Sequence, residues 1–278
     1  MDSCTTGGVG KILVGDLMST EVIRVKPGDS VVEVGNLLAE KRISGAVVSE
    51  RDNILGVISK ESFVTGVKYM GENPIDSFTV RDFMAEKYDT ASVEESLDEV
   101  VDRIAVSPHR VDRLIVLDKG RLAGILTQSD IARVFAGHAG GCFKVRDLMQ
   151  LNPIIVNDYD QIVKILQEIT LARDKRVIVM AGQKVLGVIT VLDLSLALFE
   201  KLKQQPGKDV LDLITLEDII TLDPILAKES DDAADAARLM VENRIGGLPV
   251  YENELKGVIT KTDIVKGYKI SKDTKRLK

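Results

Sequence analysis

The sequence is poor in the residues that build metal sites and disulfide frameworks. It has no tryptophan, 4% aromatic residues, two histidines and two cysteines among 278 residues. Cys4 and Cys142 lie far apart and fit neither a metal-ligand spacing nor a disulfide framework, which favours a reducing compartment. We therefore expect a cytoplasmic protein that holds no metal and needs no cofactor.

Long apolar runs and an excess of basic charge are also missing. The longest apolar stretch, residues 185–199, is interrupted by Asp193 and is shorter than the about 20 residues that a bilayer requires. No basic start followed by an apolar run marks a signal peptide. The net charge of −6 argues against a nucleic-acid backbone as the main partner. These features predict a protein that binds neither membranes nor nucleic acids.

Catalytic patterns are absent too. The sequence offers no nucleophile–base pair and no Gly-x-Ser-x-Gly elbow. We therefore assign no catalytic residue and expect a protein that is not an enzyme.

One seven-residue pattern occurs four times, as a short apolar strand that continues into a helix start. The copies are residues 56–62, 124–130, 187–193 and 257–263. Each begins with Gly, and the last residue is Asp in three copies and Ser62 in the first. A pattern that returns in this way indicates an internal repeat.

A second landmark fixes the length of the repeat. An acidic residue followed by two apolar residues precedes each copy by 39 to 42 residues, at Asp16, Asp82, Asp147 and Asp218. Turn residues and apolar periodicity between the landmarks predict a strand, a helix, two strands and a second helix, which is an α/β unit with a small mixed sheet.

Helix starts within the repeats have cap signals. Ser30 is placed to cap the first helix of repeat 1, and Ser92 with Glu95 matches a capping box in repeat 2. One such unit has too little core to be stable alone, so we expect two pairs of repeats. Glycines at 137–141 predict a hinge between the pairs. The predicted segments are a flexible tail (1–10), a first pair at 11–136 (repeats 11–70 and 79–136), a second pair at 140–268 (repeats 144–201 and 209–268) and a basic tail (269–278).

This arrangement resembles the CBS domain over roughly residues 14–268. The residues that carry the resemblance are the opening Asp-Leu-Met triplet, residues 246–250 of repeat 4 (Gly-Gly-Leu-Pro-Val) and the Gly-Val-Ile-Thr-x-x-Asp endings. The resemblance implies that repeats 1 and 2, and repeats 3 and 4, form two Bateman modules. The four-repeat plan is similar to the γ regulatory subunits of AMP-activated protein kinase and their stand-alone prokaryotic relatives. That similarity implies adenine nucleotides bound in clefts between paired repeats.

The repeated ending places chemistry suited to such a ligand at a helix start. A Thr there stands beside unpaired backbone N–H groups that favour a phosphate, which its hydroxyl can also contact. An Asp one turn later can accept both hydroxyls of a ribose. The candidate pairs are Thr127 with Asp130, Thr190 with Asp193, and Thr260 with Asp263.

The same spacing is also a helix capping box, and the two interpretations do not exclude each other. In repeat 1 the uncharged Ser62 replaces the Asp, and we expect that site to be empty.

The residue before each middle strand varies between repeats. It is Gly45, Arg113, Arg176 and Gly247 in repeats 1 to 4. The family resemblance implies that a basic residue here reaches phosphate, so Arg113 and Arg176, with the adjacent Lys175, are the phosphate candidates. The alternative is an arginine at a strand end on the surface. Gly247 leaves room for a purine or forms a tight turn.

Residues near the first strands are candidates to contact the base. Ile154 in repeat 3, and Pro224 and Ile225 in repeat 4, can line an apolar wall, and Tyr88 can stack in repeat 2. Thr221 of repeat 4 is a further candidate contact. Ordinary strand packing is the alternative for each of them.

Three hypotheses for function follow. The first is a regulatory module that binds AMP, ADP or ATP and signals energy state to an unidentified protein. The second is a sensor of S-adenosylmethionine or a related adenosyl ligand, which needs no basic phosphate clamp. The third is an interaction scaffold with vestigial clefts. Both a monomer and a homodimer fit the two-module plan.

Overall fold

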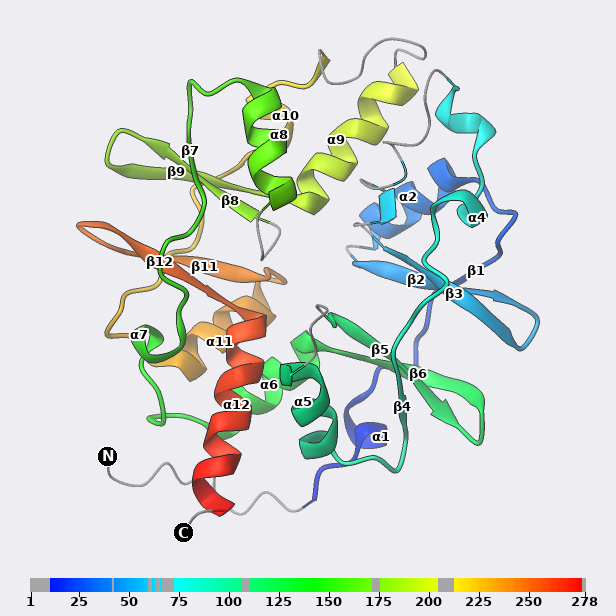
Figure 1. The fold of residues 1–278 in the computed structure, drawn as a ribbon, viewed down its shortest axis with the longest axis horizontal. Helices are drawn as coiled ribbons and strands as arrows, with labels where there is room; N and C mark the ends of the chain where they lie inside the picture. The colour runs from blue at the N-terminus through cyan, green and yellow to red at the C-terminus, as the bar shows by residue number, and fades with distance from the viewer. Residues whose placement is uncertain are drawn as a thin grey trace. The chain divides into compact units, whose positions relative to one another are not determined.

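The computed structural model describes residues 11–41, 43–59, 62–63, 66, 73–106, 111–171, 176–204 and 213–276 (Figure 1). Repeat 1 contains α1 (Val14–Leu17), β1 (Arg24–Val25), α2 (Val31–Glu40), β2 (Gly45–Glu50) and β3 (Asn53–Ser59), and η1 (Ile75–Ser77) follows it. Repeat 2 contains α4 (Val80–Phe83), β4 (Thr90–Ser92), α5 (Leu97–Val106), β5 (Arg113–Asp118), β6 (Arg121–Thr127) and α6 (Gln128–His138). Repeat 3 contains α7 (Val145–Leu148), β7 (Ile155–Asn157), α8 (Ile162–Leu171), β8 (Arg176–Ala181), β9 (Lys184–Thr190) and α9 (Val191–Gln204). Repeat 4 contains α10 (Leu216–Ile219), β10 (Thr221–Leu222), α11 (Ala233–Glu242), β11 (Gly247–Glu252), β12 (Glu254–Thr260) and α12 (Lys261–Arg276).

The predicted α/β plan is confirmed. Repeats 2 and 3 show the full order of strand, helix, strand, strand and helix. In repeat 4 the first strand is reduced to a parallel bridge between Ala227 and Val250. Most of the second helix predicted for repeat 1 lies outside the described residues. Each opening triplet adds a one-turn helix (α1, α4, α7 or α10) that the sequence analysis did not predict.

Within a repeat, the first strand is parallel to the second, and the second and third form a hairpin. In repeat 2, β4 pairs in parallel with β5, and β5 pairs antiparallel with β6. Lys119 and Gly120 at the hairpin turn both have positive φ, 48° and 79°. Two such residues in succession are typical of the tight turn whose twist matches a hairpin.

Each repeat begins with an opening segment, which is the acidic triplet and the residue after it. This segment pairs with the last strand of the partner repeat and not with a strand of its own sheet. Repeat 1 exchanges segments with repeat 2 in this way, and repeat 3 with repeat 4. The antiparallel bridges join Ser19 to Ile125, Ala85 to Val57, Gln150 to Val258 and Thr221 to Val188. This exchange gives the pairing expected for two Bateman modules.

The exchange explains why every copy of the repeated pattern begins with glycine. A Cβ atom built on any of these glycines would lie closer than 3.0 Å to a backbone oxygen of the exchanged segment. Real Cβ atoms do not approach other atoms so closely. The four positions are Gly56, Gly124, Gly187 and Gly257. Glycine is therefore required here by close backbone approach.

The chain divides into two compact units, which we describe separately. Unit 1 comprises Met1–Glu21, Asp89–Pro153 and Pro224–Lys278, and unit 2 comprises Val22–Tyr88 and Ile154–Asp223. Each exchanged segment lies in the same unit as the strand that it joins.

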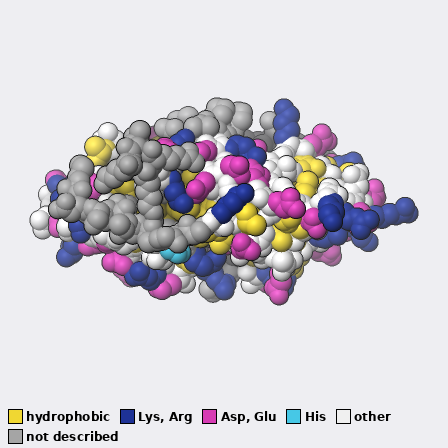
Figure 2. Space-filling model, turned by 90° about the horizontal axis from the view of Figure 1, so that it is seen from below, with side chains coloured by type: hydrophobic (Ala, Val, Ile, Leu, Met, Phe, Trp, Pro, Cys, Tyr) yellow, Lys and Arg dark blue, Asp and Glu magenta, His cyan; other side chains and the backbone are white. Residues whose placement is uncertain are grey.

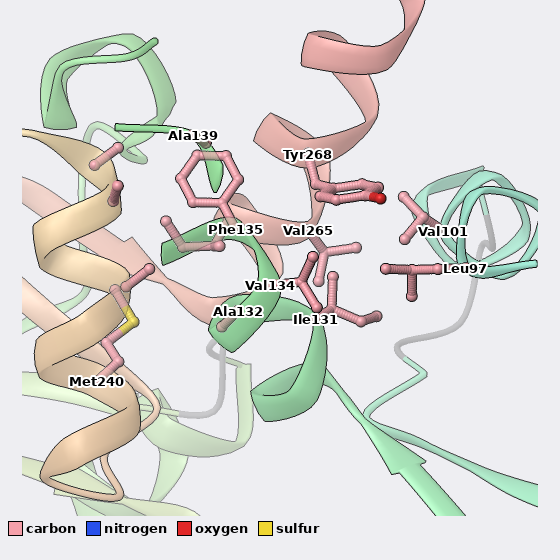
Figure 3. Close-up of a cluster of buried hydrophobic side chains, with 14 of the residues drawn as sticks. Leu97, Val101, Ile131, Ala132, Val134, Phe135, Ala139, Met240, Val265 and Tyr268 are labelled. Carbon is pink, nitrogen blue, oxygen red and sulfur yellow. The ribbon is translucent and has the colours of Figure 1, made fainter. Parts of the chain in front are cut away.

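The core of unit 1 is one continuous cluster that combines repeats 2 and 4. Val265 and Tyr268 of α12 lie in one cluster with Ile131 of α6 and Leu97 of α5 (Figure 3). On the other side of α6, helix α11 packs through alanines that include Ala237, which is fully buried. The small alanine side chains allow the two helices to pack closely against each other.

The described residues of unit 2 form two apolar clusters, one around each of its repeats. The cluster of repeat 1 includes Val34 and Leu38 of α2 and Phe83 of α4. The cluster of repeat 3 includes Ile165 of α8 and Leu194 of α9.

The glycine-rich segment 137–141 does not separate the compact units. Gly137 and His138 are the last residues of α6, and the Gly141 N–H donates a 2.6 Å hydrogen bond to Oδ2 of Asp232 at the start of α11. Both flanks of the segment belong to unit 1. The predicted pair boundaries, 11–136 and 140–268, stay a prediction. Cys4 lies outside the described residues.

Among the described residues, none of the helices is long and apolar enough to cross a bilayer. In the same part of the chain, no group of three or more His, Cys, Asp or Glu side chains is arranged to hold a metal ion. Figure 2 shows basic and acidic side chains interspersed over the described part of one face.

Candidate functional site

A Thr and the Asp three residues later form the same junction at the end of β6, β9 and β12, and we call this junction the Thr–Asp corner. In repeat 2, the N–H and hydroxyl of Thr127 donate to Oδ2 of Asp130 at 2.8 and 2.7 Å. The distances are 2.8 and 2.6 Å for Thr190 and Asp193 in repeat 3. They are 3.0 and 2.6 Å for Thr260 and Asp263 in repeat 4. Each corner therefore caps the helix that follows it.

The same hydrogen bonds occur where no ligand site is predicted. In the opening segment of repeat 2, the N–H and hydroxyl of Thr79 both donate to Asp82 at 2.8 Å. The backbone hydrogen bond from Thr79 is the main cause that holds the pKa of Asp82 below its ordinary value. A capping box alone does not identify a ligand site. In all three corners the Thr hydroxyl hydrogen points to the Asp, so a phosphate would depend on backbone N–H groups and neighbouring cations.

At two of the three corners an arginine stands opposite the Thr. The hairpin register places Arg113 directly opposite Thr127, and Arg176 directly opposite Thr190. Directly opposed residues have side chains on the same face, with Cβ atoms about 5 Å apart. Arg176 is only 8% exposed. Both arginines have interactions within the protein, although Nη1 of Arg113 and Nε of Arg176 are buried without a hydrogen bond. The structure thus brings the phosphate candidates to the Thr–Asp corners.

Repeat 3 brings further predicted residues to one sheet. The order of its strands is β10-β9-β8-β7. Thr221 of β10 pairs with Val188, two residues before Thr190. On the opposite edge, the carbonyl of Ile154 accepts a 2.9 Å hydrogen bond from the N–H of Ile178. Thr221 and Ile154 therefore border the sheet that carries Arg176 and Thr190.

In repeat 4 the predicted residues also lie in one unit, but no arginine stands opposite the Thr. Gly247 is directly opposite Thr260 in the hairpin. Pro224 and Ile225 precede the bridge between Ala227 and β11, and Ile225 is 37% exposed. This corner therefore has glycine at the position where repeats 2 and 3 have arginine.

Three other predictions have different outcomes. Tyr88 lies in unit 2, where its hydroxyl donates a 3.4 Å hydrogen bond to the carbonyl of Ile54, whereas the repeat 2 corner belongs to unit 1. Lys175 lies outside the described residues. In repeat 1 the Ser59 N–H donates to the Ser62 hydroxyl at 3.1 Å, so this corner is a neutral cap. That the site of repeat 1 is empty stays a prediction.

The sequence analysis missed Gln150. Its side-chain nitrogen lies 3.0 Å from Oδ1 and 2.9 Å from Oδ2 of Asp263. The exchanged opening segment of repeat 3 brings Gln150 to this place, through the bridge to Val258. Because the two residues are far apart in sequence, only the position of Gln150 after a repeated triplet hinted at a role.

A model of the CBS domain family matches residues 14–68, 80–137 and 211–269. These matches cover more than half of the sequence, and the chain belongs to the CBS domain family. The matched residues are those of repeats 1, 2 and 4. Repeat 3 shows the same order of elements in the structure.

Several proteins of archaea are similar to this chain. Protein MJ1225 of Methanocaldococcus jannaschii is 25% identical over 67% of this chain and 69% of its own length. Protein MJ1404 of the same organism is 26% identical over 91% of this chain, but the match spans only 61% of that protein. The crystal structure of MJ1225, which is proposed to be an archaeal homolog of γ-AMPK, superimposes with a TM-score of 0.81 at 21% identity, covering 92% of this chain and all of that one. This likeness establishes a shared four-repeat fold.

Proposed function

We propose that this chain is a non-catalytic regulatory module that binds an adenine nucleotide at the Thr–Asp corners of repeats 2 and 3. The observation that carries the proposal is the register that places Arg113 opposite Thr127 and Arg176 opposite Thr190. Each of these corners combines a helix start and a carboxylate with an arginine opposite the Thr in the hairpin register. Those groups match the phosphate and the ribose of a nucleotide.

The division of labour follows from the hydrogen bonds. Backbone N–H groups at the helix start and the arginine fork face a phosphate, and the arginine contributes two parallel donors. The carboxylate accepts from the ribose hydroxyls, because an ionised Asp offers about four acceptor positions and the Thr uses two of them. The likeness to MJ1225, proposed to be a homolog of γ-AMPK, guides the choice of AMP, ADP and ATP as ligands.

A regulatory role requires more than binding. A ligand shifts a protein between two conformations only as far as it prefers one of them. We propose that nucleotide binding changes the geometry of the paired repeats and that an unidentified partner protein recognises the change. The proposal places the protein in the cytoplasm.

The first test is the melting temperature with and without AMP, ADP, ATP or S-adenosylmethionine. Ligand at about a hundred times its Kd adds roughly 2.7 kcal/mol to the free energy of unfolding. For a chain of this size we expect a rise of about 5 to 10 °C. The double variant Asp130→Ala with Asp193→Ala should lose the rise. Asp82→Ala is the matched control, because it removes an equivalent cap away from any predicted site and should keep the rise.

Substitution of the two arginines distinguishes a ligand that carries a phosphate from one that does not. Arg113→Ala with Arg176→Ala should abolish the rise if the ligand carries a phosphate. A rise only with S-adenosylmethionine, unaffected by the arginine changes, would favour an adenosyl ligand without phosphate. No rise with any of the four compounds would contradict the proposal and leave an interaction scaffold.

A further inference from the structure

The Thr–Asp corner of repeat 4 is occupied by a side chain of the protein itself. We infer that Gln150 closes this corner to a ribose, so that it binds an adenine nucleotide much more weakly than the corners of repeats 2 and 3. This inference rests on the proposed function, and it assigns unequal roles to corners with the same Thr and Asp.

The hydrogen bonds of Asp263 leave too few acceptor positions for a diol. Oδ2 accepts from the N–H and hydroxyl of Thr260 and lies 2.9 Å from the side-chain nitrogen of Gln150. Oδ1 lies 3.0 Å from the same nitrogen and 3.7 Å from Nζ of Lys266. A carboxylate has about four acceptor positions in total. A ribose diol needs two of them, so it must displace Gln150.

Burial makes this displacement costly. The side chain of Asp263 is 2% exposed. A hydrogen bond to a buried charge is stronger than one between neutral groups, and removing it leaves the charge poorly solvated. The ligand must therefore replace each hydrogen bond that it breaks, and it gains little in return.

The corner of repeat 2 lacks this obstacle. The third partner of Asp130 is Arg133, whose side chain is 62% exposed and can turn into solvent. The residue at the position equivalent to Gln150 is Ser19, which bridges to Ile125 as Gln150 bridges to Val258. Ala85 and Thr221 occupy this position on the other two sheets. Among the four equivalents, only Gln150 combines an amide donor with a long side chain.

The test uses the full chain with Asp130→Ala and Asp193→Ala, which leaves only the corner of repeat 4. AMP affinity is measured by isothermal titration calorimetry with and without Gln150→Ser, the residue found at position 19. We expect Gln150→Ser to tighten AMP binding by about tenfold or more, since one hydrogen bond to a charged group is worth at least that factor. Ser19→Ala in the same background is the matched control and should leave the affinity unchanged.

A second ligand distinguishes two causes of tighter binding, namely the release of the Asp263 carboxylate and the removal of side-chain volume at the corner. The gain should be absent for 2′,3′-dideoxy-AMP, which lacks the diol. An equal gain with both ligands, or no gain with AMP, would overturn the inference. Should the triple variant be unstable, Gln150→Ser alone should add one AMP per chain to the stoichiometry, and an unchanged stoichiometry would refute the inference.

These outcomes are distinct from failure of the proposed function. If the unmodified chain binds AMP and loses it with the two Asp changes, the proposed function stands whatever Gln150→Ser does. If neither the unmodified chain nor any Gln150 variant binds AMP, both proposals are rejected.

Discussion

The Thr–Asp corners of repeats 2 and 4 lie in one compact unit and share their caps, yet their surroundings differ. The residue opposite the Thr is Arg113 in repeat 2 and Gly247 in repeat 4. The exchanged segment presents Ser19 to one corner and Gln150 to the other. The Asp side chain is 12% exposed in repeat 2 and 2% exposed in repeat 4. The comparison teaches that the cap belongs to the fold, whereas the positions around it set what a corner can bind.

The largest expected difference is in how much each Asp carboxylate contributes to the free energy of unfolding. Asp263→Ala leaves the donors of Gln150 and Thr260 without a buried acceptor, and we expect a loss of about 3 kcal/mol in the free energy of unfolding. Asp130→Ala removes a more exposed cap and should cost about 1 kcal/mol. Urea unfolding of both variants measures the difference, and equal losses would contradict it.

Adding a methyl group where an exchanged segment lies against a strand should lower the free energy of unfolding equally at both corners. Gly257→Ala places a Cβ against the carbonyl oxygen of Gln150, and Gly124→Ala places one against Ser19. Each should lower the free energy of unfolding by about 2 to 3 kcal/mol, because the backbone must move. Gly140→Ala, which meets no atom within 4 Å, is the control. A tolerated Gly257→Ala would show that the exchanged segment is not tightly held.

A smaller effect is expected where the helix after the repeat 4 corner meets repeat 2. The Tyr268 hydroxyl donates a 3.0 Å hydrogen bond to Asp98, and burial, then the Asp98 charge, raises the pKa of Tyr268. Tyr268→Phe should cost about 1 kcal/mol at neutral pH. Because the pKa is higher in the folded state, the advantage of Tyr268 should be full below about pH 10 and shrink above it. Denaturant unfolding across pH tests this, with Tyr159→Phe, 79% exposed, as control.

The smallest effects should come from the exposed cations of the two corners. Arg133 and Lys266 contact their Asp at 2.8 and 3.7 Å, and their side chains are 62% and 46% exposed. Such ion pairs contribute little because solvent screens them. Arg133→Ala and Lys266→Ala should each change the free energy of unfolding by less than about 0.5 kcal/mol. A larger loss for Arg133→Ala would mean that it orients Asp130.

Local patterns allowed much of the fold to be predicted from sequence. The hairpins follow from turn residues between apolar runs, and Ser30 caps α2 as expected. The Ser92 N–H does donate a 3.3 Å hydrogen bond to Glu95, but α5 begins only at Leu97, where the hydroxyl of Ser96 donates to Glu99. Two consecutive Ser-x-x-Glu patterns occur in this segment, and the sequence alone does not rank them.

The candidate site could be predicted only in part. The Thr–Asp pairs and the arginines are recognisable because each lies within one repeat, and a hairpin register brings them together. Gln150 could not be assigned, because its contact depends on a segment that crosses to a different repeat.

The exchange of opening segments has a consequence for how such a chain can be shortened or enlarged. A repeat copied singly would carry an opening segment with no strand to join, and its own last strand would present an open edge. Open edges favour association with other chains. We therefore expect the pair to be the smallest piece that can be duplicated, deleted or expressed alone. Such proteins should gain repeats in pairs, because a single added repeat would leave a strand edge unpaired.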